Sequence, residues 1–236
     1  MNDPADVYGR LLLAYLAGGG RAHEIIERDD GYIEATGGPA GYFAPVRRWA
    51  PAERQGLRFV RGRVLDVGCG AGRVALELQA RGREVAAIDV SPGAVEVARR
   101  RGVRDARVLA FEQVEAGLGR FDTLVMYGNN FGLFGSEAKA RRLLRRLRPI
   151  VGRIVASSRD PYETDDAAHL AYHERNRQRG RMSGQLRIRV RFRDYASPWF
   201  DYLIVSPDEL HRLVAGTGWR VGRLIAGDPL YVAVLE

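Results

Sequence analysis

The sequence predicts an α/β fold in which helices cover both faces of a mostly parallel sheet. From position 61 onward, short runs rich in β-branched residues alternate with segments of helical character, and alternation of this kind produces βαβ units. A glycine-rich turn joins the first of these strands to the helix after it. The chain has 236 residues, of which 46% are hydrophobic, so it is long enough for one large domain with its own core.

Residues 1–60 precede the alternating region. An amphipathic helix is predicted over 6–16, and three glycines at 18–20 end it. An aromatic and glycine-rich stretch follows, and after Pro45 we expect a second short helix that carries Trp49 and Glu53. No signal marks an independent domain here, so we interpret residues 1–60 as a helical cap on a domain that spans 61–236.

The alternating region supplies five strands and three helices. The expected strands cover residues 64–67, 84–88, 108–110, 121–126 and 153–156. The expected helices cover residues 72–80, 92–100 and 136–147. Ser91 is suited to cap the second of these helices, with Pro92 at its first position.

The last third of the chain departs from this alternation. Residues 160–205 read as an insertion that consists of a polar helix followed by a hairpin, which we interpret as a lid. Within it, apolar residues and arginines alternate over 186–193, as in a strand with one apolar and one basic face. A helix then starts at Ser206, and an antiparallel pair over 219–225 and 230–235 closes the chain.

Composition limits the partners and the compartment. The net charge is +8, but only Lys139 among the 37 basic residues is a lysine, which indicates a coding bias rather than a patch selected for nucleic acid. Cys69 is the only cysteine, so no internal disulfide is possible. The longest apolar run, 11–17, is too short to span a membrane, and the acidic start is unlike a signal peptide. We therefore expect a cytoplasmic protein with no membrane partner.

The strongest motif is Asp66-x-Gly68-x-Gly70-x-Gly72 at the end of the first strand. Glycines allow the backbone to approach a ligand closely, and the following helix start offers free N–H groups to an anion. The spacing differs from the Gly-x-Gly-x-x-Gly of dinucleotide-binding folds. A second carboxylate, Asp89, ends the next strand, where it is suited to accept hydrogen bonds from both hydroxyls of a ribose.

These residues resemble motif I and the following acidic position of the class I S-adenosylmethionine-dependent methyltransferases, over residues 61–236. The resemblance implies a Rossmann-like, doubly wound and mostly parallel seven-stranded sheet with a terminal antiparallel pair. It also implies S-adenosyl-L-methionine as the cofactor and S-adenosyl-L-homocysteine as the product. Asp66 would orient the loop or contact the methionine amino group. The expected cofactor contacts are Asp66, Gly68, Cys69, Gly70, Gly72, Asp89, Val90, Glu112, Tyr127 and Asn129.

Two of these regions have competing interpretations. Phe111-Glu112 stands where the family more usually has Gly-Asp, so Glu112 either approaches the adenine amino group or is a solvated residue at a helix start. The loop over 126–135 follows the fourth strand and is expected to face the reactive end of the cofactor. Its Asn129-Asn130 pair either holds a polar group or serves the turn.

The substrate side is less specific. The residues expected to face substrate are Tyr32, Asn130, Phe131, His173 and Trp199. A structural role is the alternative for three of them: a turn for Asn130, a helix face for His173 and the core for Trp199. His169 and His173 lack the glutamate of a His-Glu-x-x-His zinc site, so no metal is predicted, and no residue is identified as a catalytic base.

Missing residues argue against one methyltransferase class and exclude two others. The loop after the fourth strand lacks the Asn-Pro-Pro-Tyr of adenine and glutamine N-methyltransferases. Cys69 lies inside the cofactor loop, away from the place of a cytosine-methylating nucleophile, and one lysine is too few for a ribose 2′-O enzyme. We therefore predict methyl transfer to nitrogen or oxygen of a small molecule. The alternatives are an RNA methyltransferase of the same fold and a non-catalytic cofactor-binding protein; the oligomeric state is not indicated.

Overall fold

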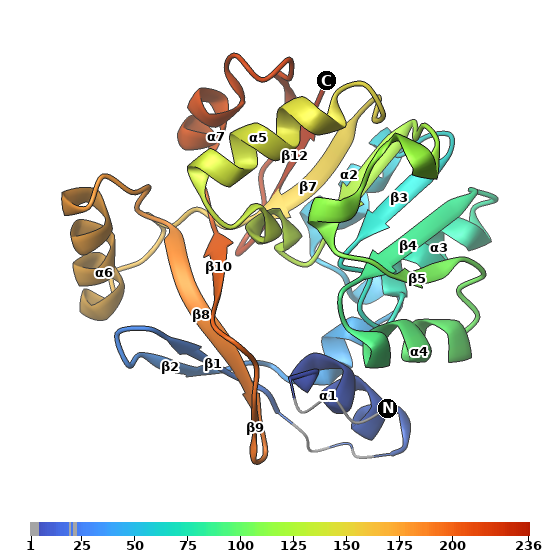
Figure 1. Cartoon of the computed structure of the whole chain (residues 1–236), viewed down its shortest axis with the longest axis horizontal. Helices are drawn as coiled ribbons and strands as arrows, with labels where there is room; N and C mark the ends of the chain where they lie inside the picture. Colours follow the sequence, from blue (N-terminus) through green and yellow to red (C-terminus); the bar gives the residue numbers. More distant parts are fainter. Residues whose placement is uncertain (1–4, 19, 21–22) are drawn as a thin grey trace. The chain divides into compact units, whose positions relative to one another are not determined.

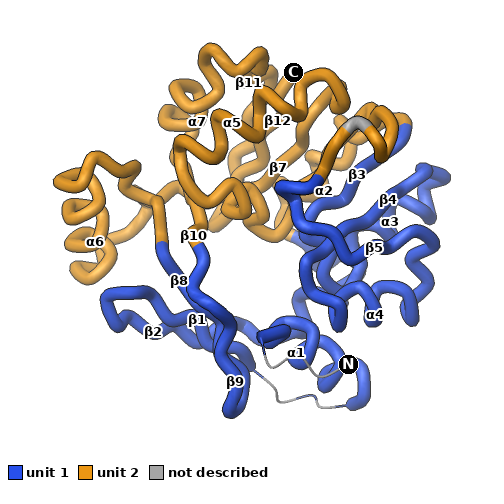
Figure 2. Tube along the Cα trace, in the orientation of Figure 1, with its two compact units in different colours: residues 1–49, 63–113, 187–200 blue, residues 50–62, 114–186, 201–236 orange. Residues whose placement is uncertain are grey.

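A computed structural model describes residues 5–18, 20 and 23–236. Part of the predicted acidic start and of the glycine stop at 18–20 therefore lies outside the described residues. Seven strands form a mixed sheet in the order β11-β12-β7-β6-β3-β4-β5, and a smaller sheet has the order β10-β8-β1-β2 with β9 beside β8 (Figure 1). The predicted fold class, a doubly wound sheet that closes with an antiparallel pair, is confirmed. The chain divides into two compact units that do not follow chain order (Figure 2).

The first unit comprises residues 1–49, 63–113 and 187–200. Its core is the βαβαβ run of β3 (Val64–Val67), α3 (Arg73–Ala80), β4 (Val85–Asp89), α4 (Pro92–Arg100) and β5 (Ala106–Val108). The three strands are parallel, with Asp66 level with Ala87 and Asp89 level with Val108. The third strand lies two residues earlier than the predicted 108–110, and both Arg107 and Val108 in it are exposed.

Helix α1 (Val7–Leu16) packs on α4 in this unit, and the predicted N-terminal helix is thereby confirmed. Leu12 is fully buried in a cluster with Ala94 and Val97 of α4. Asp6 caps α1 by accepting a hydrogen bond of 2.9 Å from the Gly9 amide. The helix predicted over 92–100 with Ser91 as its N-cap is also present, and the Ser91 hydroxyl accepts from the Ala94 amide.

The N-terminal segment also contains two strands that the sequence analysis did not predict. They are β1 (Ile25–Arg28) and β2 (Ile33–Ala35), and two short 3-10 turns, η1 (Pro39–Phe43) and η2 (Val46–Arg48), follow them. β1 pairs antiparallel with β8 (Gln185–Phe192), so the small sheet joins the two predicted regions, cap and insertion. The alternation in β8 is confirmed, because its apolar residues from position 188 onward are buried. β9 (Tyr195–Ala196) pairs with the end of β8.

The second unit comprises residues 50–62, 114–186 and 201–236. Its sheet strands are β6 (Thr123–Met126), β7 (Ile154–Ser158), β11 (Val221–Ile225) and β12 (Tyr231–Leu235). β6 and β7 are parallel, whereas β12 runs antiparallel to both β7 and β11. The remaining elements are α2 (Pro51–Gly56), η3 (Leu57–Phe59), η5 (Ala116–Leu118), η6 (Asn130–Phe134), α5 (Glu137–Leu147), α6 (Ala167–Gln178), β10 (Phe200–Leu203) and α7 (Pro207–Val214). β10 begins in the first unit.

The second predicted helix is shorter than expected. Trp49 lies outside it, because α2 begins at Pro51 and the residue before a proline is disfavoured in the helical conformation. Glu53 is part of α2 as expected and is buried. The start of α7 follows the prediction as well, with Ser206 and Glu209 in a reciprocal capping box.

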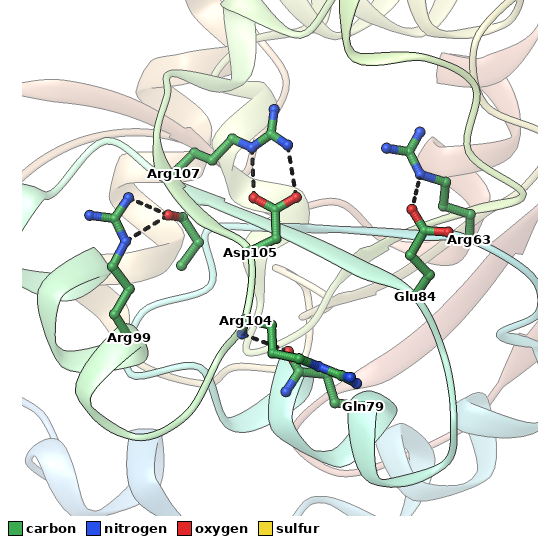
Figure 3. A network of polar contacts seen from close by, with 8 residues as sticks. Arg63, Gln79, Glu84, Arg99, Arg104, Asp105 and Arg107 are labelled. Atoms are coloured by element: carbon green, nitrogen blue, oxygen red, sulfur yellow. Dashed lines mark hydrogen bonds and ion pairs between the residues drawn. The ribbon is translucent and has the colours of Figure 1, made fainter.

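Arginine and acidic side chains pair with one another along one edge of the first unit (Figure 3). Arg63 lies 2.7 Å from Glu84, and Arg107 forms a two-pronged pair with Asp105 at 2.7 and 2.8 Å. Arg99 instead donates to the carbonyl oxygen of Ala106. Arg63 and Arg107 are therefore paired with acidic side chains, whereas Arg99 contacts a neutral backbone oxygen.

No helix in the described part of the chain combines the length and the apolar character that crossing a membrane requires.

Candidate functional site

The glycine loop between β3 and α3 adopts a conformation that suits glycine. Gly68, Gly70 and Gly72 have φ angles of 69°, 51° and 78°, in the left-handed region that other residues rarely occupy. A Cβ atom on Gly72 would lie 2.6 Å from Val103, so this position also requires a residue without a side chain. A Cβ atom on Gly70 would meet no atom within 4 Å, so space is open above this glycine.

Asp89, at the end of β4, holds this loop. Its Oδ2 accepts a hydrogen bond of 2.9 Å from the Gly70 amide, and its Oδ1 accepts one of 3.0 Å from the Ser91 amide. Each carboxylate oxygen has two lone pairs, so both oxygens can accept a further donor. Burial raises the pKa of Asp89, and its backbone hydrogen bonds oppose that shift.

Asp66 is a buried carboxylate beneath the loop, with 2% of its surface exposed. Burial raises its pKa to about 7, while the charge of Arg73 and a backbone hydrogen bond from Ala75 oppose the shift. Among the described residues its Oδ2 has no hydrogen-bond partner. Burial also raises the pKa of the Cys69 thiol, so this cysteine is a neutral group in the loop. A buried acceptor without a partner suits a ligand that brings a donor.

Residues from the N-terminal segment approach the same part of this unit, and the sequence analysis did not assign them to the site. Asp6 accepts hydrogen bonds from the Ser91 hydroxyl at 2.6 Å and from the Gly93 amide at 2.8 Å. Its charge also contributes to the raised pKa of Asp89. An aspartate before a helix signals an N-cap, but its second partner, 85 residues away in the chain, leaves no local signal.

A hydrogen-bonded chain of three side chains lies in the same unit. The hydroxyls of Tyr8 and Tyr42 are 2.5 Å apart, and the Tyr42 hydroxyl donates to Glu24 Oε1 at 2.8 Å. Glu24 is fully buried. Burial raises the pKa of Tyr8, and the charges of Glu24 and Asp89 raise it further, so Tyr8 is within electrostatic reach of the carboxylate that holds the glycine loop.

Two of the predicted cofactor contacts, Val90 and Glu112, are on the surface of the first unit. Val90 is 66% exposed and follows Asp89 directly. Glu112 is exposed within the short turn η4 (Phe111–Gln113), next to the buried ring of Phe111. The adenine ring has apolar faces and a polar edge, so an exposed valine and an exposed glutamate are compatible with contacts to the cofactor. Both contacts stay predictions.

In the second unit, the loop after β6 is held by a buried carboxylate. Glu53 of α2 accepts hydrogen bonds from the Gly128 amide at 2.6 Å and from the Ser157 hydroxyl at 3.1 Å. The Ser157 hydroxyl in turn accepts from the Asn129 amide at 3.0 Å. Asn129 has a φ of 67°, so this network stabilises a backbone conformation that is unfavourable for most residues. The sequence placed Glu53 on a helix but gave no sign of this contact.

Asn129 also accepts two hydrogen bonds, one on its side chain and one on its backbone carbonyl oxygen. Its Oδ1 accepts a hydrogen bond from the Arg159 amide, beyond the end of β7, and its carbonyl oxygen accepts one of 2.6 Å from the Tyr202 hydroxyl. Tyr127, two residues earlier in the chain, is buried. The carboxamide oxygen of Asn129 is therefore used in a hydrogen bond within the protein. Its contact with a cofactor stays a prediction.

The residues expected to face substrate have different surroundings. Within the second unit, Phe131 is 1% exposed and packs against Phe134, and His173 is 3% exposed and lies edge-on to Tyr162. Asn130 starts the turn η6 and is half-buried.

Two expected substrate residues lie in the first unit, and both are half-buried. The guanidinium of Arg28 covers the ring of Tyr32 at 4.6 Å, and that of Arg189 covers the ring of Trp199 at 4.7 Å. The first unit thus brings together the glycine loop, Asp66 and Asp89, with Tyr32 and Trp199 elsewhere in it. The second unit brings together Tyr127 and Asn129. Within the described ranges, no group of three or more His, Cys, Asp or Glu residues is arranged to hold a metal ion.

Comparison with protein-family models identifies a methyltransferase domain over residues 64–151, from the start of β3 to just before β7. The ubiquinone biosynthesis O-methyltransferase of Methylocella silvestris is 37% identical over 86 residues, or 34% of this chain and 32% of that protein. The magnesium-protoporphyrin O-methyltransferase of Rhodobacter capsulatus is 37% identical over 67 residues, or 27% of this chain and 30% of that protein. The chain thus matches about a third of the length of these curated relatives.

Solved structures match over more of the chain. A methyltransferase from Bacteroides fragilis, in complex with S-adenosyl-L-homocysteine, is 26% identical with a TM-score of 0.82, and the match covers 100% of this chain and 96% of that one. The CcbJ methyltransferase from Streptomyces caelestis is 14% identical with a TM-score of 0.59, covering 83% of this chain and 97% of that one, which is a likeness of fold alone.

Proposed function

Because the chain belongs, by its domain and its fold, to the class I S-adenosylmethionine-dependent methyltransferases, we propose that it transfers a methyl group from that cofactor to nitrogen or oxygen of a small molecule. The observation that carries the proposal is the pairing of two acidic residues with the glycine loop: Asp66 beneath it and Asp89 hydrogen-bonded to it. The similar chain from Bacteroides fragilis, which matches along the whole length, was crystallised with S-adenosyl-L-homocysteine.

The residues of the first unit fit this cofactor. Asp66 Oδ2 is a buried acceptor without a partner among the described residues, and the methionine end of the cofactor carries an ammonium group that would supply one. Asp89 keeps acceptor capacity on both oxygens for the ribose hydroxyls. The open space above Gly70 would admit the cofactor close to the backbone. When bound, S-adenosylmethionine supplies a methyl group on a positively charged sulfur.

The remaining tasks of the protein are positioning and exclusion of water. In our proposal, Asp66, Gly68, Cys69, Gly70, Gly72, Asp89 and Val90 form the cofactor cradle, and Glu112, Tyr127 and Asn129 are further cofactor contacts. Tyr32, Asn130, Phe131, His173 and Trp199 remain our proposed substrate residues, residues 1–60 the cap and 160–205 the lid. The single cysteine supports a cytoplasmic location.

The matched segments of two O-methyltransferases that modify small molecules favour a small acceptor over RNA. The test is release of S-adenosyl-L-homocysteine from the full chain, with phenols, carboxylic acids, amines and a short RNA supplied as separate acceptors. We expect release with at least one small-molecule class above the level without acceptor. Release of S-adenosyl-L-homocysteine with RNA alone would instead favour an RNA methyltransferase. Tight cofactor binding with no release from any acceptor class would favour a non-catalytic binding protein.

A further inference from the structure

A shallow hollow in the second unit gathers four arginines. It has a volume of about 500 Å³, and its lining includes Arg61, Arg148, Arg153 and Arg220 together with Trp219 and Glu236. Arg153 directly precedes β7, Arg220 precedes β11, and Glu236 follows β12. The loop that carries Asn129 follows the opposite, carboxyl end of β6, which is parallel to β7. The hollow is therefore at the other edge of the sheet from that loop, near the C-terminus marked in Figure 1.

The charges in this hollow are not balanced. Glu236 is the only acidic side chain in the lining; it pairs with Arg153 at 2.5 Å and with Arg220 at 3.0 Å. Arg61 and Arg148 are exposed, and neither side chain has a hydrogen bond or an ion pair to another residue of the described ranges. Four guanidinium groups thus share one acidic side chain. In the first unit, by comparison, Arg63 and Arg107 each pair with a separate carboxylate, Glu84 and Asp105 (Figure 3).

Two of the guanidinium groups are also held in place. Arg153 donates to the carbonyl oxygen of Phe59 at 3.1 Å as well as pairing with Glu236, and its side chain is only 14% exposed. Its Nε is buried and has no hydrogen-bond partner in the part of the chain that the structure describes. Arg148 lies over the ring of Trp219, with its guanidinium carbon 4.6 Å from the ring centre. Fixed guanidinium donors lose less entropy on binding than flexible ones, and their planar geometry matches phosphate oxygens.

We propose that this hollow binds a small phosphate-bearing anion, at a site separate from the proposed cofactor cradle. The ring of Trp219 is covered by Arg148 and its indole nitrogen donates to the Leu144 carbonyl, so the site offers charge and donors but no open aromatic face for a base. The ligand class is therefore the phosphate group itself, as inorganic phosphate, as pyrophosphate or at the end of a small metabolite. The proposal does not depend on the methyltransferase activity.

The test uses the full chain and a matched pair of double variants. Arg61→Ala with Arg220→Ala removes two lining charges, whereas Arg142→Ala with Arg146→Ala removes two exposed charges on α5 outside the lining. Both variants lower the net charge equally, so non-specific attraction changes by the same amount in each. Circular dichroism and thermal unfolding without ligand establish that both variants fold.

Binding of inorganic phosphate and of pyrophosphate is then measured by isothermal titration calorimetry at constant ionic strength. We expect saturable binding of at least one of them, with one site per chain. The lining variant should bind about tenfold or more weakly, while the α5 variant binds as the unaltered chain does. Equal weakening in both variants, or no saturable binding, would overturn the proposal. Binding of a short RNA in the absence of phosphate or pyrophosphate binding would overturn it in favour of a nucleic-acid surface.

Discussion

The Oδ2 atom of Asp89 lies 2.9 Å from the amide nitrogen of Gly70, so the end of β4 fixes the centre of the glycine loop that follows β3. The same carboxylate accepts from the Ser91 amide at the start of α4. One residue therefore determines the positions of a loop and a helix start while retaining lone pairs for a ligand. This relationship is the centre of the cofactor proposal.

Replacing Asp89 by alanine should weaken binding of S-adenosyl-L-homocysteine by about tenfold to a hundredfold. Hydrogen bonds to a charged group contribute about 1.5–3 kcal/mol, and each 1.4 kcal/mol corresponds to a factor of ten in affinity. Titration calorimetry measures the change. The control is Asp105→Ala, which removes an exposed carboxylate that pairs with Arg107. Equal affinities for unaltered chain and Asp89→Ala would rule out the role assigned to Asp89.

Two glycines of the loop should respond differently to alanine. At Gly72 the new methyl group would lie 2.6 Å from Val103, so Gly72→Ala should lower the free energy of unfolding by about 2 kcal/mol or more. At Gly70 the methyl group meets no atom, and the strain of a positive φ, about 1 kcal/mol, is the main effect on folding. Gly70→Ala should instead reduce cofactor affinity, because the methyl group enters the proposed cradle.

Urea unfolding and cofactor titration of the two glycine variants separate these effects. Loss of affinity in Gly70→Ala, with a loss of stability of only about 1 kcal/mol, supports the position of the cradle. If Gly70→Ala binds the cofactor as tightly as the unaltered chain does, the open space above Gly70 is not part of the cofactor site.

The buried carboxyl of Asp66 should make folding stability depend on pH. Its folded pKa is about 7, against an ordinary value of 3.8, so the folded chain retains a proton that the unfolded chain has already lost between these values. The contribution of Asp66 to the free energy of unfolding is therefore highest below about pH 4, falls as the pH rises to about 7, and is constant above that. The difference of about three pKa units corresponds to about 4 kcal/mol.

The measurement is urea unfolding of the ligand-free chain and of Asp66→Asn from pH 4 to pH 8. The asparagine variant has no carboxyl to titrate at this position. As the pH rises, its free energy of unfolding should therefore increase relative to that of the unaltered chain. A difference that stays constant over this range would show that Asp66 titrates with an ordinary pKa.

Glu53 and Ser157 should contribute to stability as a coupled pair. Glu53 accepts from both the Gly128 amide and the Ser157 hydroxyl, and that hydroxyl accepts from the Asn129 amide. In a double-mutant cycle of Glu53→Gln and Ser157→Ala, the coupling energy should be about 0.5–3 kcal/mol. Pairing Glu53→Gln with Arg142→Ala, an exposed residue of α5, provides the reference and should give additive effects. Additivity in both cycles would mean that the network does not act as a unit.

Local patterns predicted the elements that local sequence determines. The strand, glycine turn and capped helix from Val64 to Arg100 lie within a residue or two of their predicted positions, since alternation, glycine spacing and the Ser91 cap are all properties of neighbouring residues. The paired carboxylates followed from the same reasoning, because the ends of adjacent parallel strands meet at one edge.

Contacts between distant residues could not be predicted in this way. β1 owes its strand conformation to pairing with β8, with Ile25 opposite Arg191, and all three residues of β2 are exposed, so neither has a strong apolar alternation. Asp6 and Glu53 are recognisable only as residues near helix starts, whereas their partners are 85 and 75 residues away along the chain. Such pairings depend on the tertiary fold.

The most direct test of the cofactor assignment is titration calorimetry of the full chain with S-adenosyl-L-homocysteine and, separately, with NADH. We predict one saturable site for S-adenosyl-L-homocysteine, weakened in Asp89→Ala, and no binding of NADH, because the glycine spacing and the paired carboxylates select the adenosyl compound. Binding of NADH together with no binding of S-adenosyl-L-homocysteine would contradict it.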